Sequence, residues 1–307
     1  MNHNLWHGCW NASRIHSLCS ALSRRYAFVQ RICIGRSVMG REIHALRLGC
    51  GKNHVLYHGA HHANEWITAP LLLRFVCELS AAADCSGTLG DTAARELLSR
   101  TCFHIIPAVN PDGIDLVTGA LRSGVFYCGA KRIADKYPHI PFPDGWKANI
   151  KGVDLNLQYP AGWEEARCIK AKAGIIAPAP RDYVGIGALC APEARALYEY
   201  TLKISPALTL SYHTQGREIY WQYKNFAPAA AQSIAGQFAA SSGYRAAEVP
   251  YASGFAGYKD WFLQHYRRPA FTVEAGLGEN PLPISQFEEI YRDNLGILLR
   301  AAQVFSV

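Results

Sequence analysis

Apolar and polar residues follow two different periods along the chain. Short apolar runs rich in β-branched and aromatic residues indicate strands, whereas apolar residues three or four positions apart indicate helices. Strands are expected over residues 28–34, 43–48, 54–58, 101–109, 207–212, 218–222 and 270–273. Helices are expected after residue 65, over 192–203 and 228–241, and after residue 284. Because the two kinds of element alternate, the sequence predicts an α/β fold.

Two stretches show no clear periodicity of apolar residues. Residues 1–26 mix polar and apolar positions and form an N-terminal extension whose packing the sequence does not predict. They contain no uninterrupted apolar segment of the kind that a secretory signal requires. Residues 114–146 contain several prolines and glycines and follow an Asn-Pro-Asp-Gly turn at 110–113. We therefore expect 114–146 to form a long surface loop with little regular structure, which in a compact domain is usually functional.

Length and composition predict one globular domain. The chain has 307 residues, of which 50% are hydrophobic and 18% charged, so it can bury a full core. No linker rich in proline, glycine or serine separates two halves, and we expect residues 1–307 to form a single domain. The apolar stretches are too short to span a bilayer, which argues against a membrane protein.

The net charge bears on the kind of partner, and the cysteine content bears on the cellular compartment. The formal net charge of +7 comes from dispersed basic residues, whose tightest pairs are too small for a nucleic-acid footprint. A basic cleft would instead attract a substrate that carries several carboxylates. The ten cysteines are scattered and form no Cys-x-x-Cys pair, as expected of thiols in a reducing compartment. Together with the missing secretory signal, this predicts a cytoplasmic protein.

Three residues have the chemistry of a zinc site. His62 and Glu65 lie three positions apart in a polar corner between a strand and a helix, and His213 follows an apolar strand. Imidazole and carboxylate ligands suit Zn²⁺, and a catalytic zinc needs three protein ligands and one open position. Each residue also has a structural interpretation, since strand-end histidines are often only hydrogen-bonded and Glu65 could stabilise the next helix through its dipole. The surrounding motifs decide between these interpretations.

Five motifs in order strongly resemble the zinc metallocarboxypeptidases. They are residues 59–68, the Asn-Pro-Asp-Gly at 110–113, the Gly-Val-Asp-Leu-Asn at 152–156, the strand-end His213, and the Thr-Val-Glu at 272–274. The resemblance covers residues 34–289. It implies a single-domain zinc carboxypeptidase-like fold, with a mixed, twisted sheet of about eight strands and helices on both faces. It also implies one Zn²⁺ per chain, held by His62, Glu65 and His213.

The same resemblance implies roles for residues around the metal. Asp154 matches the carboxylate that orients His62, as metal-bound imidazoles generally need. Glu274 matches the general base that activates the attacking water and then passes its proton to the leaving amine. A cation that stabilises the developing oxyanion is expected before the Asp-x-Asn motif, and Lys147 is the nearest match, with Lys151 as a rival.

One position departs from the digestive carboxypeptidases. In those enzymes Asn156 would be followed by an arginine, and the two residues clamp the free C-terminal carboxylate of the peptide. Here the second residue is Leu157. Without the guanidinium, simple removal of C-terminal residues is a less suitable activity.

A subset of the family shares this departure and further segments of this sequence. The shared segments are residues 146–149, 159–164, 213–216, 257–262 and 276–283. They resemble the bacterial γ-D-glutamyl-diaminopimelate endopeptidases, which cut the amide between γ-D-glutamate and diaminopimelate in cell-wall stem peptides. The resemblance implies a zinc peptidase of muropeptide turnover or recycling, with a small peptide or muropeptide as its partner.

Three further residues are candidates for substrate binding. Lys259 is near the position that faces the side chain after the scissile bond, where a cation would suit the side-chain carboxylate of diaminopimelate. It could equally be a lysine on a helix surface. Tyr251 is a candidate for the mobile tyrosine that caps the substrate in this family, and Tyr258 competes with it.

Two other functions remain open from the sequence. The first is an ordinary metallocarboxypeptidase that replaces the missing arginine with another cation, and tolerance of a blocked C-terminus would distinguish it. The second is a non-catalytic muropeptide-binding protein, which would have lost a ligand or the base, whereas this chain retains His62, Glu65, His213 and Glu274. Nothing in the sequence predicts the oligomeric state.

Overall fold

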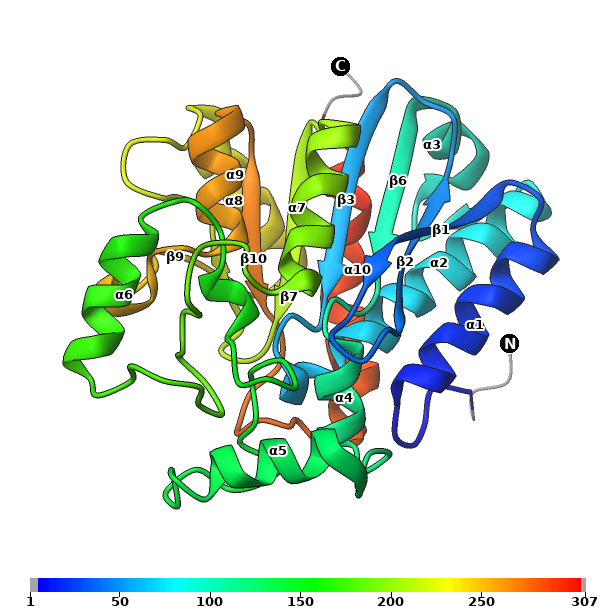
Figure 1. Cartoon of the computed structure of the whole chain (residues 1–307). Helices are drawn as coiled ribbons and strands as arrows, with labels where there is room; N and C mark the ends of the chain where they lie inside the picture. Colours follow the sequence, from blue (N-terminus) through cyan, green and yellow to red (C-terminus); the bar gives the residue numbers. More distant parts are fainter. Residues whose placement is uncertain (1–4, 305–307) are drawn as a thin grey trace.

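An eight-stranded mixed sheet forms the centre of the protein, which the computed structural model describes over residues 5–304 (Figure 1). The strands, in their order across the sheet, are β1 (Val29–Arg36), β2 (Glu42–Leu48), β6 (Thr101–Ile106), β3 (Asn53–Gly59), β7 (Leu208–His213), β10 (Ala270–Glu274), β8 (Glu218–Tyr220) and β9 (Arg245–Ala247). The four central strands β6, β3, β7 and β10 run parallel, so their carboxyl ends meet at one edge. Beside them, β4 (Thr88–Leu89) and β5 (Thr92–Ala93) form a small separate sheet.

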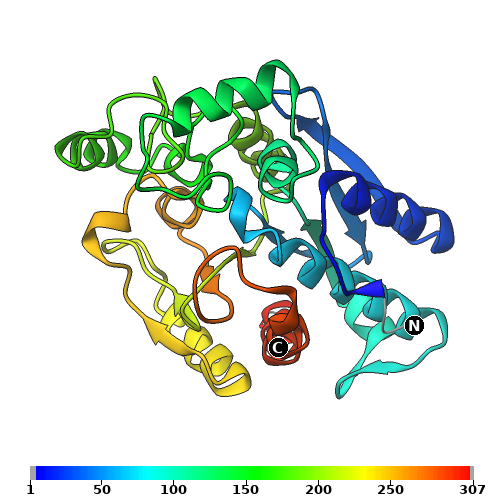
Figure 2. The same cartoon turned by 90° about the horizontal axis from the view of Figure 1, so that it is seen from below.

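Helices cover both faces of the central sheet. The helices on one face are α1 (Ala12–Arg25), α2 (Thr68–Asp84), α3 (Ala94–Arg100), α8 (Ala230–Ser242) and α10 (Phe287–Gln303). On the other face lie α7 (Pro192–Ile204) and α9 (Tyr258–Tyr266), and Figure 2 shows α8 and α9 on opposite sides of β10. Side chains alternate between the faces, because Val55 and Tyr57 belong to the first core and Leu56 to the second. The predicted mixed sheet of about eight strands with helices on both faces is confirmed.

A long apolar helical stretch is part of this core. Among the described residues, Ala63–Asp84 is the one stretch long and apolar enough to cross a membrane by length and composition, with a mean hydropathy of 1.4. However, 78% of that window is buried inside the protein, as in the core helix of a globular domain. The stretch packs against the sheet and α3.

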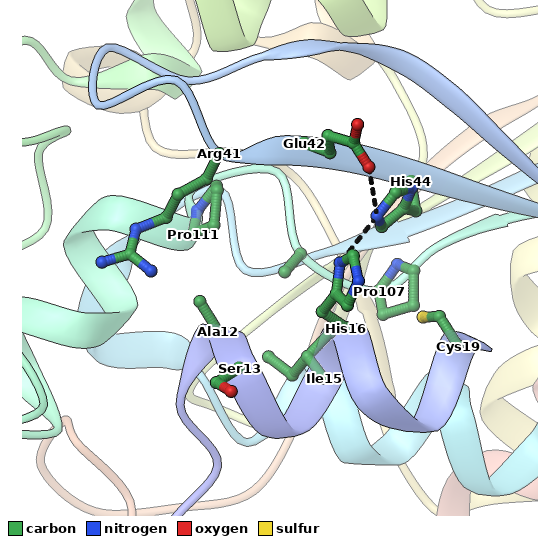
Figure 3. A pocket seen from close by; sticks show the side chains of 11 residues that line it. Ala12, Ser13, Ile15, His16, Cys19, Arg41, Glu42, His44, Pro107 and Pro111 are labelled. Atoms are coloured by element: carbon green, nitrogen blue, oxygen red, sulfur yellow. Dashed lines mark hydrogen bonds and ion pairs between the residues drawn. The ribbon is translucent and has the colours of Figure 1, made fainter. Parts of the chain in front are cut away.

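The N-terminal extension contains a helix that the sequence did not predict. Asn11 caps α1 by accepting a hydrogen bond from the Arg14 amide, and the helix buries Ile15, Cys19 and Leu22. These residues recur at helical spacing, but the polar residues between them hid the period. A cavity of about 310 Å³ lies between α1 and β2. Figure 3 shows the side chains that line it.

The expected long loop over residues 114–146 is wrong in its first half. The chain forms α4 (Pro111–Val117) and α5 (Gly124–Ala134), and only then continues without a regular element to the short turn η3 (Leu155–Leu157). Asn110 caps α4 and Pro111 occupies its first turn, so the Asn-Pro-Asp-Gly motif begins a helix and is not the turn into a loop that the sequence predicted. A further helix, α6 (Trp163–Lys172), follows η3, and the turns η4 (Tyr251–Ser253) and η5 (Ile284–Gln286) precede α9 and α10. In Figure 1, α4 and α5 lie below the carboxyl ends of the parallel strands.

Candidate active site

The predicted zinc ligands meet at the carboxyl edge of the parallel strands. His62 and Glu65 lie at the short helical turn η2 (Ala63–Glu65), which joins β3 to α2. His213 is the last residue of β7, and β7 pairs in parallel with β3. Two neighbouring strands therefore end at the same point and bring together residues about 150 positions apart in the chain, as α/β sheets do with site residues.

The three side chains have the spacing of a zinc ligand set. Glu65 Oε1 lies 2.9 Å from His62 Nδ1, and Glu65 Oε2 lies 2.9 Å from His213 Nδ1. The two Nδ1 atoms are 3.2 Å apart. In a tetrahedral site with Zn–N distances of about 2.0–2.1 Å, neighbouring nitrogens are about 3.3 Å apart. His62, Glu65 and His213 therefore fit the zinc that the resemblance implies.

The charges around His62 favour a cation at this point. Burial opposes a positive charge, but Glu65 and Asp154 raise the pKa of His62 to about 9. Asp154 Oδ1 lies 3.2 Å from His62 Nε2, on the side of the ring away from Glu65. Burial would raise the pKa of Asp154, yet His62 holds that pKa below its usual range. Asp154 thus lies where a carboxylate would orient the imidazole of His62.

Glu274 lies beside the ligand set. It is the last residue of β10 and pairs with His213 in the parallel register of β10 and β7. Burial, reinforced by the charge of Glu65, raises the pKa of Glu274 to about 8. Within residues 5–304 its carboxylate forms no hydrogen bond, and its side chain lines the same cavity as the three ligands. Its position is that of a group free to exchange protons with a substrate.

The two candidate oxyanion cations have different surroundings. Lys147 lines the cavity and its Nζ donates to Glu65 Oε1 at 2.9 Å. Burial opposes its charge, but Glu65 raises the pKa of Lys147 above the usual value. Lys151 is exposed and its Nζ lies 5.5 Å from the ring centre of Phe126, outside the residues that line the cavity. Of the two lysines, the structure brings only Lys147 to the ligands.

The cavity at this edge is large enough for a peptide. Its volume is about 1150 Å³, and its lining combines the ligands with Asn156, Leu157, Lys259 and Arg181. Lys259 is not a helix-surface lysine, because it is only 4% exposed and its Nζ donates to Asp260 Oδ1 at 2.5 Å. A second hydrogen bond of 2.7 Å joins the same ammonium to the carbonyl oxygen of Gln222.

Arg181 lines the same cavity, and the sequence analysis missed it. It follows a proline-rich segment with no motif, so only its neighbourhood reveals it. Its guanidinium forms an ion pair of 3.1 Å with Asp182 and remains about half exposed. The residue adds a guanidinium to the lysines that line the cleft.

The two candidate capping tyrosines differ in exposure. Tyr258 is fully buried, and its hydroxyl lies 2.9 Å from the Thr201 hydroxyl, so the prediction that it caps the substrate is wrong for this structure. Tyr251 is 77% exposed on η4, next to Pro250 and Ser253 of the cavity wall. Asn156 accepts a hydrogen bond from the Tyr258 amide and so fixes the start of α9 beside the cavity.

Two other histidines near the ligands are bonded elsewhere. His58 Nε2 lies 2.9 Å from the Ser211 hydroxyl, and His61 Nε2 lies 2.9 Å from the Tyr159 hydroxyl. Both histidines are fully buried and belong to the layer under the site. The ring of His61 stacks on that of His213 with ring centres 5.7 Å apart, and neither His58 nor His61 is among the described residues that line the cavity.

Close packing behind the ligands depends on one glycine. Gly113, in the first turn of α4, lies so near η2 that a methyl group on it would stand 2.7 Å from the Ala63 Cβ. Asn110 reaches the same region and donates to the His61 carbonyl at 3.2 Å. The Asn-Pro-Asp-Gly motif at 110–113 therefore holds the turn that carries Glu65.

The likeness to known proteins agrees with this geometry. The family model described as zinc carboxypeptidase matches residues 15–296. The chain is 41% identical over 278 residues to the γ-D-glutamyl-L-diamino acid endopeptidase 1 of Lysinibacillus sphaericus, covering 91% of this chain and 68% of that protein. The fold is similar to a carboxypeptidase A from Helicoverpa armigera, with a TM-score of 0.73, 19% identity, and coverage of 98% of this chain and 75% of that one.

A second solved structure is that of an amidase. The murein-tripeptide amidase MpaA of Escherichia coli O157 is similar with a TM-score of 0.52 and 20% identity, over 88% of this chain and 91% of that one. At such identities the likeness shows the fold alone, whereas the family model covers most of the chain. The protein therefore belongs to the zinc carboxypeptidase family and is a zinc peptidase.

Proposed function

We propose that this protein hydrolyses the amide bond between γ-D-glutamate and diaminopimelate in cell-wall stem peptides. The observation that carries the proposal is Leu157 in the cavity wall, at the position where the carboxypeptidase resemblance implies an arginine. A peptidase without that clamp has no bidentate partner for an ordinary C-terminal carboxylate. The 41% identity to a γ-D-glutamyl-L-diamino acid endopeptidase supports the same substrate class.

The residues of the cavity divide the work of this reaction. When bound, Zn²⁺ supplies a Lewis acid that polarises the scissile carbonyl and lowers the pKa of water. Glu274 takes the proton from the attacking water and delivers it to the leaving nitrogen of diaminopimelate. The Lys147 ammonium stabilises negative charge that develops on the carbonyl oxygen. Asp154 fixes the orientation of His62 throughout.

Cations along the cleft support a substrate with several carboxylates. Lys259 and Arg181 both line the cavity, and both are already paired with an aspartate. A carboxylate of the substrate can share such an ammonium or guanidinium, because each has more than one N–H to donate. We assign Lys259 to the side-chain carboxylate of diaminopimelate, and Tyr251 to the cap over the bound peptide.

Defined stem peptides test the proposal. Zinc-loaded protein should cleave L-Ala-γ-D-Glu-meso-diaminopimelate at the γ-D-glutamyl amide, and act poorly on blocked dipeptides ending in Phe, Leu or Arg. Lys259→Met should weaken cleavage of this substrate about ten- to a hundredfold more than cleavage of its lysine analogue, which lacks the second carboxylate. Efficient release of ordinary C-terminal residues, with the γ-D-glutamyl bond left intact, would make the protein a plain metallocarboxypeptidase.

We also propose a cytoplasmic location for this activity. All ten cysteines are free, and six of them are exposed, which suits a reducing compartment. Fractionation of the producing cells, followed by detection of the protein with an antibody, tests this location. Recovery in a secreted or wall-bound fraction would contradict it.

A further inference from the structure

Two histidines and a cysteine lie together at the opposite edge of the sheet. Cys102 and His104 are two positions apart on β6, so their side chains point to the same face. His54, on the parallel strand β3, is the register partner of Cys102. All three lie on the face that α7 covers, far from the carboxyl ends that hold the catalytic zinc ligands. None of them is among the described residues that line the active-site cavity.

Their ligand atoms have the spacing of a metal site. His54 Nδ1 lies 2.9 Å from His104 Nε2, and Cys102 Sγ lies 3.6 Å from the same nitrogen. The three atoms all lie within 4.8 Å of one another. A tetrahedral zinc with Zn–N of about 2.0–2.1 Å and Zn–S of about 2.3 Å separates two nitrogens by about 3.3 Å, and nitrogen from sulfur by about 3.6 Å.

Each of the two buried ligands has a hydrogen-bond partner that is compatible with metal binding. The Tyr200 hydroxyl of α7 lies 2.7 Å from His104 Nδ1. A cation at Nε2 leaves the ring hydrogen on Nδ1, where the Tyr200 oxygen can accept it, as a metal-bound imidazole requires. Arg47 Nε donates to Cys102 Sγ at 3.3 Å, and a metal-bound sulfur can accept the same hydrogen bond. The same guanidinium repels a bound cation, but the thiolate charge offsets this repulsion.

The three ligands are buried to different degrees, which leaves a path for a metal ion to enter the site. Cys102 is 0% and His104 2% exposed, so both are held rigidly between the sheet and α7. His54 is only partly buried and lies at the rim of the cluster. A metal ion can therefore reach the site from the solvent side of His54, and water can complete its coordination there.

We propose that His54, Cys102 and His104 bind a second, thiophilic transition-metal ion, Zn²⁺ in the first place, at a site independent of the catalytic zinc. Thiolate and imidazole together select zinc-like ions over Mg²⁺ or Ca²⁺. An ion at this site joins β3 to β6 at their amino ends and has no access to the peptide cleft. The role of this site is structural, because the bound ion holds the two strands together.

A third cluster, at the cavity of Figure 3, is chemically less suited to a metal. His16 Nδ1 lies 2.9 Å from His44 Nε2, and Glu42 Oε2 lies 3.5 Å from the same nitrogen. However, the Arg31 guanidinium lies 3.2 Å from His16 Nε2. A cation at Nδ1 would leave a hydrogen on Nε2 facing another donor. The histidine pair and Arg31 are better explained as a hydrogen-bonded chain that joins α1 to the antiparallel strands β1 and β2.

Cobalt substitution tests the proposal without relying on peptidase activity. A thiolate ligand gives Co²⁺ an intense near-ultraviolet charge-transfer absorption, and the catalytic ligand set contains no sulfur. The full-length protein is stripped of metal, titrated with Co²⁺ or Zn²⁺, and analysed for metal content and absorption. The variants are Cys102→Ala and His54→Ala, with Cys77→Ala as a control that removes another buried thiol and His62→Ala as a control at the catalytic edge.

The expected results separate the two sites. Wild type and Cys77→Ala should bind about two metal equivalents per chain and give the sulfur band, since both ligand sets are intact. Cys102→Ala and His54→Ala should each lose about one equivalent together with the sulfur band, and both should keep peptidase activity. His62→Ala should lose activity and keep the band. A wild type that binds a single equivalent, or a sulfur band that survives in Cys102→Ala, would overturn the proposal and leave the proposed peptidase function untouched.

Discussion

The parallel strands hold a set of three ligands at each of their two ends, here called the carboxyl edge and the amino edge of the sheet. The two sets have different surroundings. At the carboxyl edge, His62 and Glu65 come from a strand-helix corner and line a cavity of about 1150 Å³. At the amino edge, Cys102 and His104 lie within a strand and are covered by α7. Grouped ligands therefore do not by themselves make a catalytic site. Turnover also needs an open cavity and a group such as Glu274 that can exchange a proton with the substrate.

Removal of one ligand at each edge should give the largest difference in peptidase activity between two variants. His62→Ala should reduce peptidase activity to background and abolish metal at the catalytic site, because three protein ligands are the minimum for a tight catalytic zinc. His54→Ala should leave kcat/KM near that of wild type. Stem-peptide kinetics together with metal analysis measure both effects. Full metal occupancy in His62→Ala would move the assignment to His61 or His58.

Loss of the proposed base should have the next largest effect. Glu274→Gln is nearly isosteric but cannot accept a proton, so kcat should fall at least about a hundredfold while the zinc content stays constant. Metal content and circular dichroism of the variant serve as the controls. Near-normal turnover would exclude Glu274 from the mechanism and leave Glu279, also in the cavity wall, or solvent as the base.

The residues that orient the histidine ligands should affect metal affinity at their own edge of the sheet. Asp154→Asn should weaken zinc binding at the catalytic site about tenfold to a hundredfold, the usual effect of a group that orients a metal-bound histidine. Tyr200→Phe should weaken binding at the amino edge only. Competition with a chromophoric chelator measures the two affinities in the same protein. Equal affinities in wild type and Asp154→Asn would show that His62 is oriented by other contacts.

The smallest expected effect concerns stability in the absence of metal. Cys102→Ala removes one buried atom from a well-packed layer, which should lower the free energy of unfolding by about 1 kcal/mol. Cys77→Ala on α2 should cost a similar amount. Urea unfolding with a chelator present measures both variants. If zinc then stabilises wild type but not Cys102→Ala, the difference reports metal binding at the amino edge.

The catalytic edge could be predicted from the sequence because its residues lie in ordered motifs. His62, Glu65 and Glu274 each end or follow an apolar strand, and parallel strands bring such ends together. The motifs also indicated Lys147 in preference to Lys151. The strands themselves were apparent as apolar runs, so the sheet was predictable in outline.

The remaining features depend on contacts that leave no local trace in the sequence. Tyr258 occupies a position suitable for a substrate cap, but α9 turns its ring into the core. Arg181 reaches the cleft from an irregular segment. His54 and Cys102 become neighbours only through the register of two strands nearly 50 positions apart in the chain. The helix α4 was mistaken for a turn because the same Asn-Pro-Asp-Gly residues favour both structures.

The close contact between Gly113 and Ala63 determines how much the active site tolerates sequence change. Any side chain at Gly113 would push α4 away from η2, since the Ala63 Cβ would stand only 2.7 Å away. The displacement would reach Glu65 through the backbone, although Gly113 is not among the described residues that line the cavity. Variation that adapts this protein to new peptides is therefore easier at an exposed position of the cleft wall, for example at His139, than at a buried glycine that no substrate meets.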